Sequence, residues 1–130
     1  MLFRLLFLIA SMLALISPTG AQGLLTVTDA NFEKLVSSSQ LPIVVIVKAD
    51  WCEKCRDTMP IIEDLQVEMK GQVRFAVLDA DANQKTAAKL NVMNIPFIAI
   101  FRNGRQMSKQ VGMINRSTLV EWINTSLGAH

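Results

Sequence analysis

Two hydrophobic periodicities along residues 24–128 predict strands and helices in a mostly alternating order. Short runs rich in Val, Ile and Phe predict strands, and apolar residues that recur every three or four positions predict the buried faces of helices. The predicted strands span residues 24–28, 43–49, 73–79, 97–101 and 106–111. The predicted helices span residues 32–36, 56–69, 84–90 and 115–127.

The order of these elements, β-α-β-α-β-α-β-β-α, indicates an α/β fold. Strands joined through helices form crossover connections, so most of the sheet should be parallel, with helices over both faces. Residues 43–47 are apolar throughout, which is typical of a central strand covered on both sides. Asn103-Gly104 predicts a hairpin between the last two strands, and this makes the sheet mixed. We therefore expect a central mixed sheet of about five strands flanked by four helices.

Polar residues beside the predicted helices are candidate caps, because their side-chain oxygens accept from the unpaired N–H groups of a first turn. Thr28 or Asp29 is expected to cap the first helix, and Asp81 or Asn83 the third. Asn91 is expected to end the third helix in the left-handed conformation.

The first residues of the chain have the layout of a secretory signal peptide. Residues 1–4 form a short segment with a positive charge, and residues 5–16 are almost entirely apolar. Residues 17–21 are small or helix-breaking. Cleavage is expected after Ala21. Hydrophobic residues make up 51% of the chain, and part of this high share belongs to the leader.

An uncleaved membrane anchor is the alternative for this segment. Pro18, Gly20 and Gln22 interrupt the apolar run before it reaches the ~20 residues that span a bilayer. We expect residues 1–21 to be a signal peptide and residues 22–130 to be one domain, periplasmic or secreted. No stable membrane insertion is expected after cleavage.

The charge of the expected mature chain does not indicate a nucleic-acid partner. Without Arg4 it carries 12 Lys and Arg against 11 Asp and Glu, a net charge of +1. The sequence also has no basic block and no interleaving of basic and aromatic residues. We expect no nucleic-acid binding and a monomeric protein.

The only two cysteines lie in Trp51-Cys52-Glu53-Lys54-Cys55, between a predicted strand and a predicted helix. A CxxC at such a turn is the arrangement used for thiol–disulfide exchange. Cys52 would lie at the helix N-terminus, where unpaired N–H groups and the helix dipole stabilise a thiolate. Cys55, one turn later, would face the same way and could attack a mixed disulfide formed at Cys52.

A structural disulfide and a metal site are the alternatives for this pair. A Cys-x-x-Cys loop is too short to restrain much chain entropy, which argues against a structural role. The pair is half of a zinc site, but the chain has no second pair, and its only histidine, His130, is the final residue. We therefore expect neither a metal nor another cofactor.

Further motifs join the cysteine motif at distances that agree with a known family. They are Pro60 within a predicted helix, Asp79 and Asp81 after the third strand, Ile95-Pro96 before a strand, Asn103-Gly104 at a turn, and Val111-Gly112. On these residues the chain resembles the thioredoxin family over nearly all of residues 24–128, without insertions. The resemblance implies the thioredoxin fold.

The resemblance also implies a cis bond at Ile95-Pro96, which would lay Ile95 beside Cys52. Backbone groups there would hydrogen-bond an extended substrate segment. The implied substrate-binding residues are Trp51, Ala80, Ile95, Pro96, Gly112 and Met113. Met113 is flexible and suits varied substrates, or it is a simple surface methionine.

One departure from the family lies between the cysteines, where thioredoxins usually carry Gly-Pro and this chain has Glu53-Lys54. In the superfamily this dipeptide tunes the redox potential. Lys54 favours the Cys52 thiolate and Glu53 disfavours it, so charge alone predicts no direction.

Two further departures remove a buried charged pair. Ile46 and Val77 occupy the positions of the family's buried acid and its lysine partner. Losing both together is physically consistent, because one alone would be an unpaired buried charge. Proton transfer at Cys55 must then rely on water or another group. Asp50 and Lys48 are candidates, or they are simply solvated surface charges.

Together these features predict an exported thiol–disulfide oxidoreductase that reduces disulfides of exported proteins through a Cys52–Cys55 cycle. A membrane or soluble electron donor would recycle it. The alternatives are an oxidase or isomerase that runs the same chemistry in the other direction, and a redox-silent thioredoxin-fold binding module. The sequence leaves open the direction of electron flow, the substrate and the electron partner.

Overall fold

A five-stranded sheet and four helices make up the part of the chain that the computed structural model describes, residues 23–112 and 114–128. In chain order the elements are β1 (Leu25–Val27), α2 (Phe32–Ser38), β2 (Ile43–Lys48), α3 (Glu53–Glu68), β3 (Arg74–Asp79), α4 (Gln84–Lys89), β4 (Phe97–Arg102), β5 (Arg105–Val111) and α5 (Arg116–Gly128). This order confirms the predicted α/β fold with a mixed sheet.

The strands lie in the order β1-β3-β2-β4-β5. β1, β3 and β2 are parallel, whereas β4 runs antiparallel to β2 and β5 antiparallel to β4. β2 is central, as predicted, and each of its first five residues is buried. A strand in this position pairs on both edges and contacts helices on both faces, which explains its uninterrupted apolar sequence.

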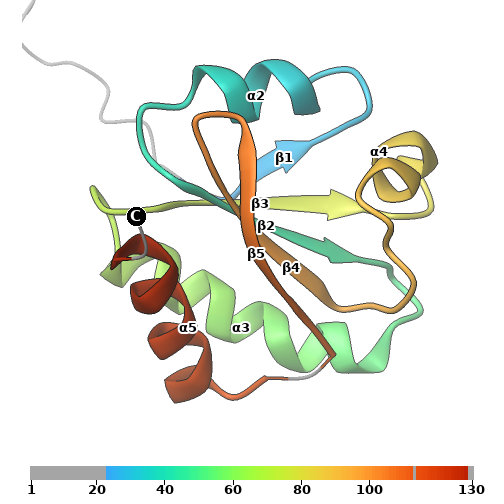
Figure 1. The fold of residues 1–130 in the computed structure, drawn as a ribbon. Helices are drawn as coiled ribbons and strands as arrows, with labels where there is room; N and C mark the ends of the chain where they lie inside the picture. Colours follow the sequence, from blue (N-terminus) through green and yellow to red (C-terminus); the bar gives the residue numbers. More distant parts are fainter. Residues whose placement is uncertain (1–22, 113, 129–130) are drawn as a thin grey trace, which may run out of the picture.

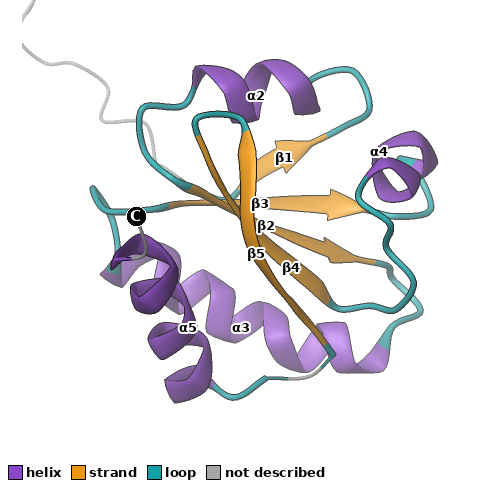
Figure 2. Ribbon diagram, viewed as in Figure 1, coloured by secondary structure: helices purple, strands orange, loops and turns teal. Residues whose placement is uncertain are grey.

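The helices divide between the two faces of the sheet, with α2 and α4 on one side and α3 and α5 on the other (Figure 1). Figure 2 shows the strands as a twisted layer between them. Because side chains alternate along a strand, neighbouring residues of β2 enter different cores: Val45 and Val47 face α2, and Val44 and Ile46 face α3.

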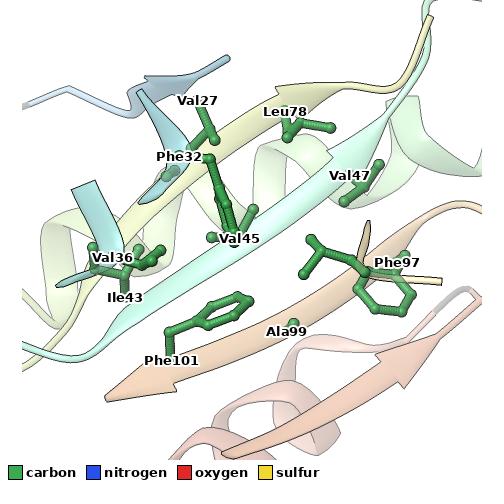
Figure 3. Packing of buried hydrophobic residues seen from close by; sticks show 12 residues of the cluster. Val27, Phe32, Val36, Ile43, Val45, Val47, Leu78, Phe97, Ala99 and Phe101 are labelled. Carbon is green, nitrogen blue, oxygen red and sulfur yellow. The ribbon is translucent and has the colours of Figure 1, made fainter. Parts of the chain in front are cut away.

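The core under α2 is closed by two aromatic rings. Phe32 of α2 and Phe101 of β4 meet edge to face, with ring centroids 5.6 Å apart. Figure 3 shows Phe32 and Val36 of α2 lying against the sheet residues of this cluster. The edge-to-face arrangement is a favoured geometry for aromatic pairs.

The second core lies between the sheet and the longer helices. Ile62 and Leu65 of α3 and Leu119 and Ile123 of α5 are fully buried there. These residues occupy helical spacings, so each helix presents one apolar side to the sheet. α3 continues through Pro60 as one helix.

Asn91, which was predicted to be left-handed, and Asn103 of the predicted turn both have positive φ angles. Asn91 follows α4 with φ 55°, and Asn103 in the turn between β4 and β5 has φ 54°. Gly104, with φ 78°, completes that turn, which confirms the predicted hairpin.

The capping predictions for α2 and α4 were partly wrong. Thr28 does serve the turn before α2, since its hydroxyl accepts from the Asn31 N–H. Asp29 instead accepts from the backbone N–H and the hydroxyl of Thr86, in the first turn of α4. Asn83 precedes α4 without a side-chain cap, and its Oδ1 accepts from the Asp29 N–H. Both loops lie at the carboxyl ends of parallel strands, so a residue 57 positions away in sequence takes the place of a local cap.

Some predictions concern residues outside the described part of the chain. These are the signal peptide at residues 1–21, the start of the domain at residue 22, Met113 as a groove residue, and His130. Among the helices of residues 23–112 and 114–128, none has the length and apolar character needed to cross a bilayer.

Candidate active site

Helix α3 begins at the cysteine motif, three residues earlier than predicted, because Cys52 itself is its N-cap. Cys52 has an extended backbone, and its Sγ accepts from the Cys55 N–H at 3.2 Å. A disulfide joins the two sulfurs across this first turn. The predicted position of Cys52 at the helix N-terminus is therefore observed, and a thiolate formed there would meet unpaired N–H groups and the positive end of the helix dipole.

The disulfide lies in a small apolar cluster at the end of β2. Ala49, Cys52 and Cys55 are buried together, and Ile95 packs against them. Cys52 is 6% exposed and Cys55 is 2% exposed. Cys52 is thus slightly nearer to solvent, which suits the sulfur that meets a substrate first.

The predicted groove residues come from four separate segments and meet at one edge of the sheet. Trp51 follows β2, Ala80 follows β3, Pro96 precedes β4, and Gly112 follows β5. Because β4 is antiparallel to β2, its beginning lies at the edge where β2 ends. The structure therefore brings these residues to the edge that carries the disulfide.

A backbone hydrogen bond joins the residue before β4 to the residue after β5. The Ile95–Pro96 peptide bond is cis. The Gly112 N–H donates to the Pro96 carbonyl at 2.9 Å. Gly112 has φ 90°, a conformation that glycine adopts without the strain a side chain would bring.

Trp51 is the large exposed side chain of the site, with 68% of its surface accessible. Its indole N–H donates to the Asp81 carboxylate at 2.8 Å. Asp79 in turn accepts from the backbone N–H groups of Asp81 and Ala82, which shapes the loop that carries Asp81. Sequence reasoning treated Asp81 as a candidate helix cap and missed this contact; the signal was its place just after β3, at the same edge as Trp51.

A pocket of about 480 Å³ opens beside Cys55. Its lining comprises Lys48, Ala49, Asp50, Cys55, Arg56, Met59, Pro60 and Glu63. The Lys48 ammonium lies 3.1 Å from Oδ1 of Asp50. Arg56 donates to the Asp50 carbonyl at 3.0 Å, a contact that the sequence did not suggest. Four of the residues that line this pocket with Cys55 are therefore charged.

Four further residues singled out from the sequence lie near this site, two at the surface and two within the sheet. Glu53 and Lys54 are both exposed in the first turn of α3. Ile46 and Val77 are direct neighbours on β2 and β3, and Ile46 is fully buried. The two positions that departed from the family are thus adjacent and apolar.

One carboxylate at this edge of the sheet has a displaced pKa. The Thr86 hydroxyl and backbone N–H hold the pKa of Asp29 below its ordinary value of 3.8, although desolvation acts in the opposite direction. Asp29 joins the loop before α2 to the first turn of α4, and we call this pair of hydrogen bonds to Thr86 the clamp.

The arrangement suits sulfur exchange. A disulfide at a helix N-terminus can be opened to a stabilised thiolate, and the second sulfur lies one turn away to close it again. Among the described residues, no group of three or more His, Cys, Asp or Glu side chains could hold a metal ion.

Comparison with known proteins gives a consistent result. The family model described as Thioredoxin matches residues 23–125. The thioredoxin of Rickettsia bellii is 36% identical over 101 residues, which cover 78% of this chain and 96% of that protein. The thioredoxin of Haemophilus influenzae is 34% identical over 100 residues, covering 77% of this chain and 94% of the relative. Thioredoxin C-2 of Corynebacterium nephridii is also 34% identical, over 77% of this chain and 93% of its own length.

Proposed function

The chain belongs to the thioredoxin family and is a thiol–disulfide oxidoreductase, and from this premise we propose that it reduces the disulfides of exported proteins. The observation that carries the proposal is the pair Cys52 and Cys55 in the first turn of α3, beside an exposed Trp51.

The proposed cycle has two exchange steps. In the reduced protein the Cys52 thiolate attacks a substrate disulfide, forms a mixed disulfide and releases one substrate thiolate, which takes up a proton. The Cys55 thiol then loses its proton and attacks Sγ of Cys52. The bond between Cys52 and the second substrate sulfur breaks, and its electron pair leaves with that sulfur. The substrate gains two electrons, and the protein gains the Cys52–Cys55 disulfide.

The edge around the disulfide is the proposed binding groove for an extended peptide. Ile95 lies against the cysteine cluster, and the backbone on both sides of Pro96 lies beside the end of β5. Hydrogen bonds from backbone groups would hold the substrate chain, and Trp51 and Ala80 would contact its side chains. Met113 is proposed as a further contact by position in the sequence.

Two features favour the reducing direction. Ile95 stands before the cis proline, and no inserted helical or dimerisation domain interrupts the elements of the described chain. The pattern of residues 1–21 supports export. A reductant in an oxidising compartment needs electrons from elsewhere, so a membrane or soluble donor is proposed as its partner.

The reduction potential of the Cys52–Cys55 couple tests the direction. Equilibration with glutathione or dithiothreitol buffers should give a value near that of thioredoxin, about −270 mV. A value near −120 mV would instead mark an oxidant and reverse the proposed flow of electrons. Export is tested separately, by fractionating a host that expresses the full chain and measuring the mass of the mature N-terminus, where cleavage after Ala21 is expected.

A further inference from the structure

Resolution of a mixed disulfide requires a Cys55 thiolate, and the surroundings of Cys55 oppose its formation. Cys55 is 2% exposed and packs with Ala49, Cys52 and Ile95, none of which carries a charge. Apolar burial raises the pKa of a thiol. Ile46 and Val77, deeper in the sheet, offer no ionisable group. Charged residues do line the pocket to which Cys55 contributes.

That pocket, at about 480 Å³, has room for water and polar groups to hold it. The charged side chains in its lining are Lys48, Asp50, Arg56 and Glu63. Asp79 is the cross-strand neighbour of Lys48, and its carboxylate accepts hydrogen bonds from two backbone N–H groups of the loop after β3. Arg56 donates to the Asp50 carbonyl, and Lys48 is the last residue of β2.

The position of Lys48 is set by the strand. It follows Ile46 by two residues on β2, so its side chain leaves the sheet on the face that carries α3. The side chain is 26% exposed, and its ammonium is held by Asp50. Lys48 therefore has a largely buried stem and a charged head at the pocket.

We propose that Lys48 is a positioning residue for the second exchange step, stabilising the Cys55 thiolate through the water of this pocket. Asp50 holds the ammonium in place without entering the reaction. The proton of Cys55 passes to pocket water, and the thiolate then attacks Sγ of Cys52 as described above. This inference rests on the proposed function, because it concerns one step of that cycle.

The test separates the two steps by stopped-flow spectroscopy. Reduced protein is mixed with a symmetrical nitrobenzoate disulfide that releases one coloured thiolate when Cys52 attacks and a second when Cys55 resolves. The rates of both phases are measured across pH for the unaltered protein, Lys48→Met, Lys48→Arg and Lys34→Met. Lys34→Met is the matched control, since it removes the same charge from an exposed position on α2.

Lys48→Met should raise the midpoint of the second phase by about one pH unit and slow that phase about tenfold at neutral pH. The first phase should keep its midpoint. Lys48→Arg, which keeps the positive charge, should restore the second phase, and Lys34→Met should change neither.

Unchanged pH midpoints in Lys48→Met would overturn the inference. An equal shift of the midpoints of both phases would also overturn it, because Lys48 would then affect both cysteines alike through its charge. If Lys48→Met does not fold, Lys48→Gln and Lys48→Arg still separate loss of charge from loss of packing. The proposed function fails in a different way, by a reduction potential that marks an oxidant, and that result leaves the comparison of the two phases unaffected.

Discussion

Helices α3 and α4 both begin at the carboxyl edge of the parallel strands, and different groups satisfy their first turns. In α3 the acceptor is the sulfur of Cys52, the residue directly before the helix, which accepts from the Cys55 N–H. In α4 it is the carboxylate of Asp29, which comes from the loop before α2 and receives two hydrogen bonds from Thr86.

The carboxylate of Asp29 and the sulfur of Cys52 differ in the charge states that they can adopt. A carboxylate at a helix N-terminus carries a negative charge throughout the neutral pH range, so its effect is on stability. A cysteine sulfur there exists as a disulfide, a thiol or a thiolate, and the helix favours the reactive thiolate. The unpaired N–H groups of a helix N-terminus thus stabilise a reactive sulfur in α3, and in α4 they hold the loop before α2 to the start of the helix.

The largest effect should follow from replacing the sulfur. Cys52→Ser keeps a good N-cap, since serine oxygen accepts the same kind of bond, but it removes the nucleophile. Disulfide reduction, measured by insulin precipitation, should fall by about a thousandfold or more. Thermal unfolding should stay close to that of the reduced, unaltered protein. Retention of insulin reduction in this variant would contradict the role of Cys52.

The converse change is Asp29→Asn, which should lower the unfolding temperature and leave insulin reduction almost unchanged. The depressed pKa of Asp29 means that the unfolded chain binds a proton more tightly. Its stabilising effect is therefore complete above its ordinary pKa of 3.8 and is lost as pH falls through the lower folded value.

Thermal melts as a function of pH check this prediction. The difference in unfolding temperature between the unaltered protein and Asp29→Asn should be constant near neutrality and shrink in acid. Asp64→Asn is the matched control, because Asp64 is an exposed carboxylate on α3 away from the clamp. A difference that grows as pH falls would show that the hydrogen bonds to Thr86 do not favour the ionised carboxylate.

The smallest effect is expected from Asp81. This residue lies just before α4, but its carboxylate accepts a hydrogen bond from Trp51 of the cysteine motif. Asp81→Asn should weaken the hold on the indole and lower kcat/KM for a peptide disulfide about threefold, with little change in unfolding temperature. Asp29→Asn should show the reverse pattern. If Asp29→Asn and Asp81→Asn lowered the unfolding temperature equally and neither changed kcat/KM, the two carboxylates would not have the different roles proposed for them.

Much of this molecule follows from local sequence patterns. The uniformly apolar residues 43–47 identified the central strand, and Asn103-Gly104 identified the hairpin. The CxxC at a strand-to-helix turn placed Cys52 at the start of α3. Such features depend on residues close together in the chain, where spacing and backbone preference determine the outcome.

The tertiary structure decided which distant groups meet. Asp29 and Asp81 each stood next to a plausible local helix, yet Asp29 serves α4 and Asp81 serves Trp51. Likewise Lys48 and Asp50 were charged residues of open role until the pocket placed both beside Cys55. The reason is that parallel strands deliver the loops after β1, β2 and β3 to one edge, where a polar side chain bonds to the nearest suitable group in space, and sequence distance has no part in that choice.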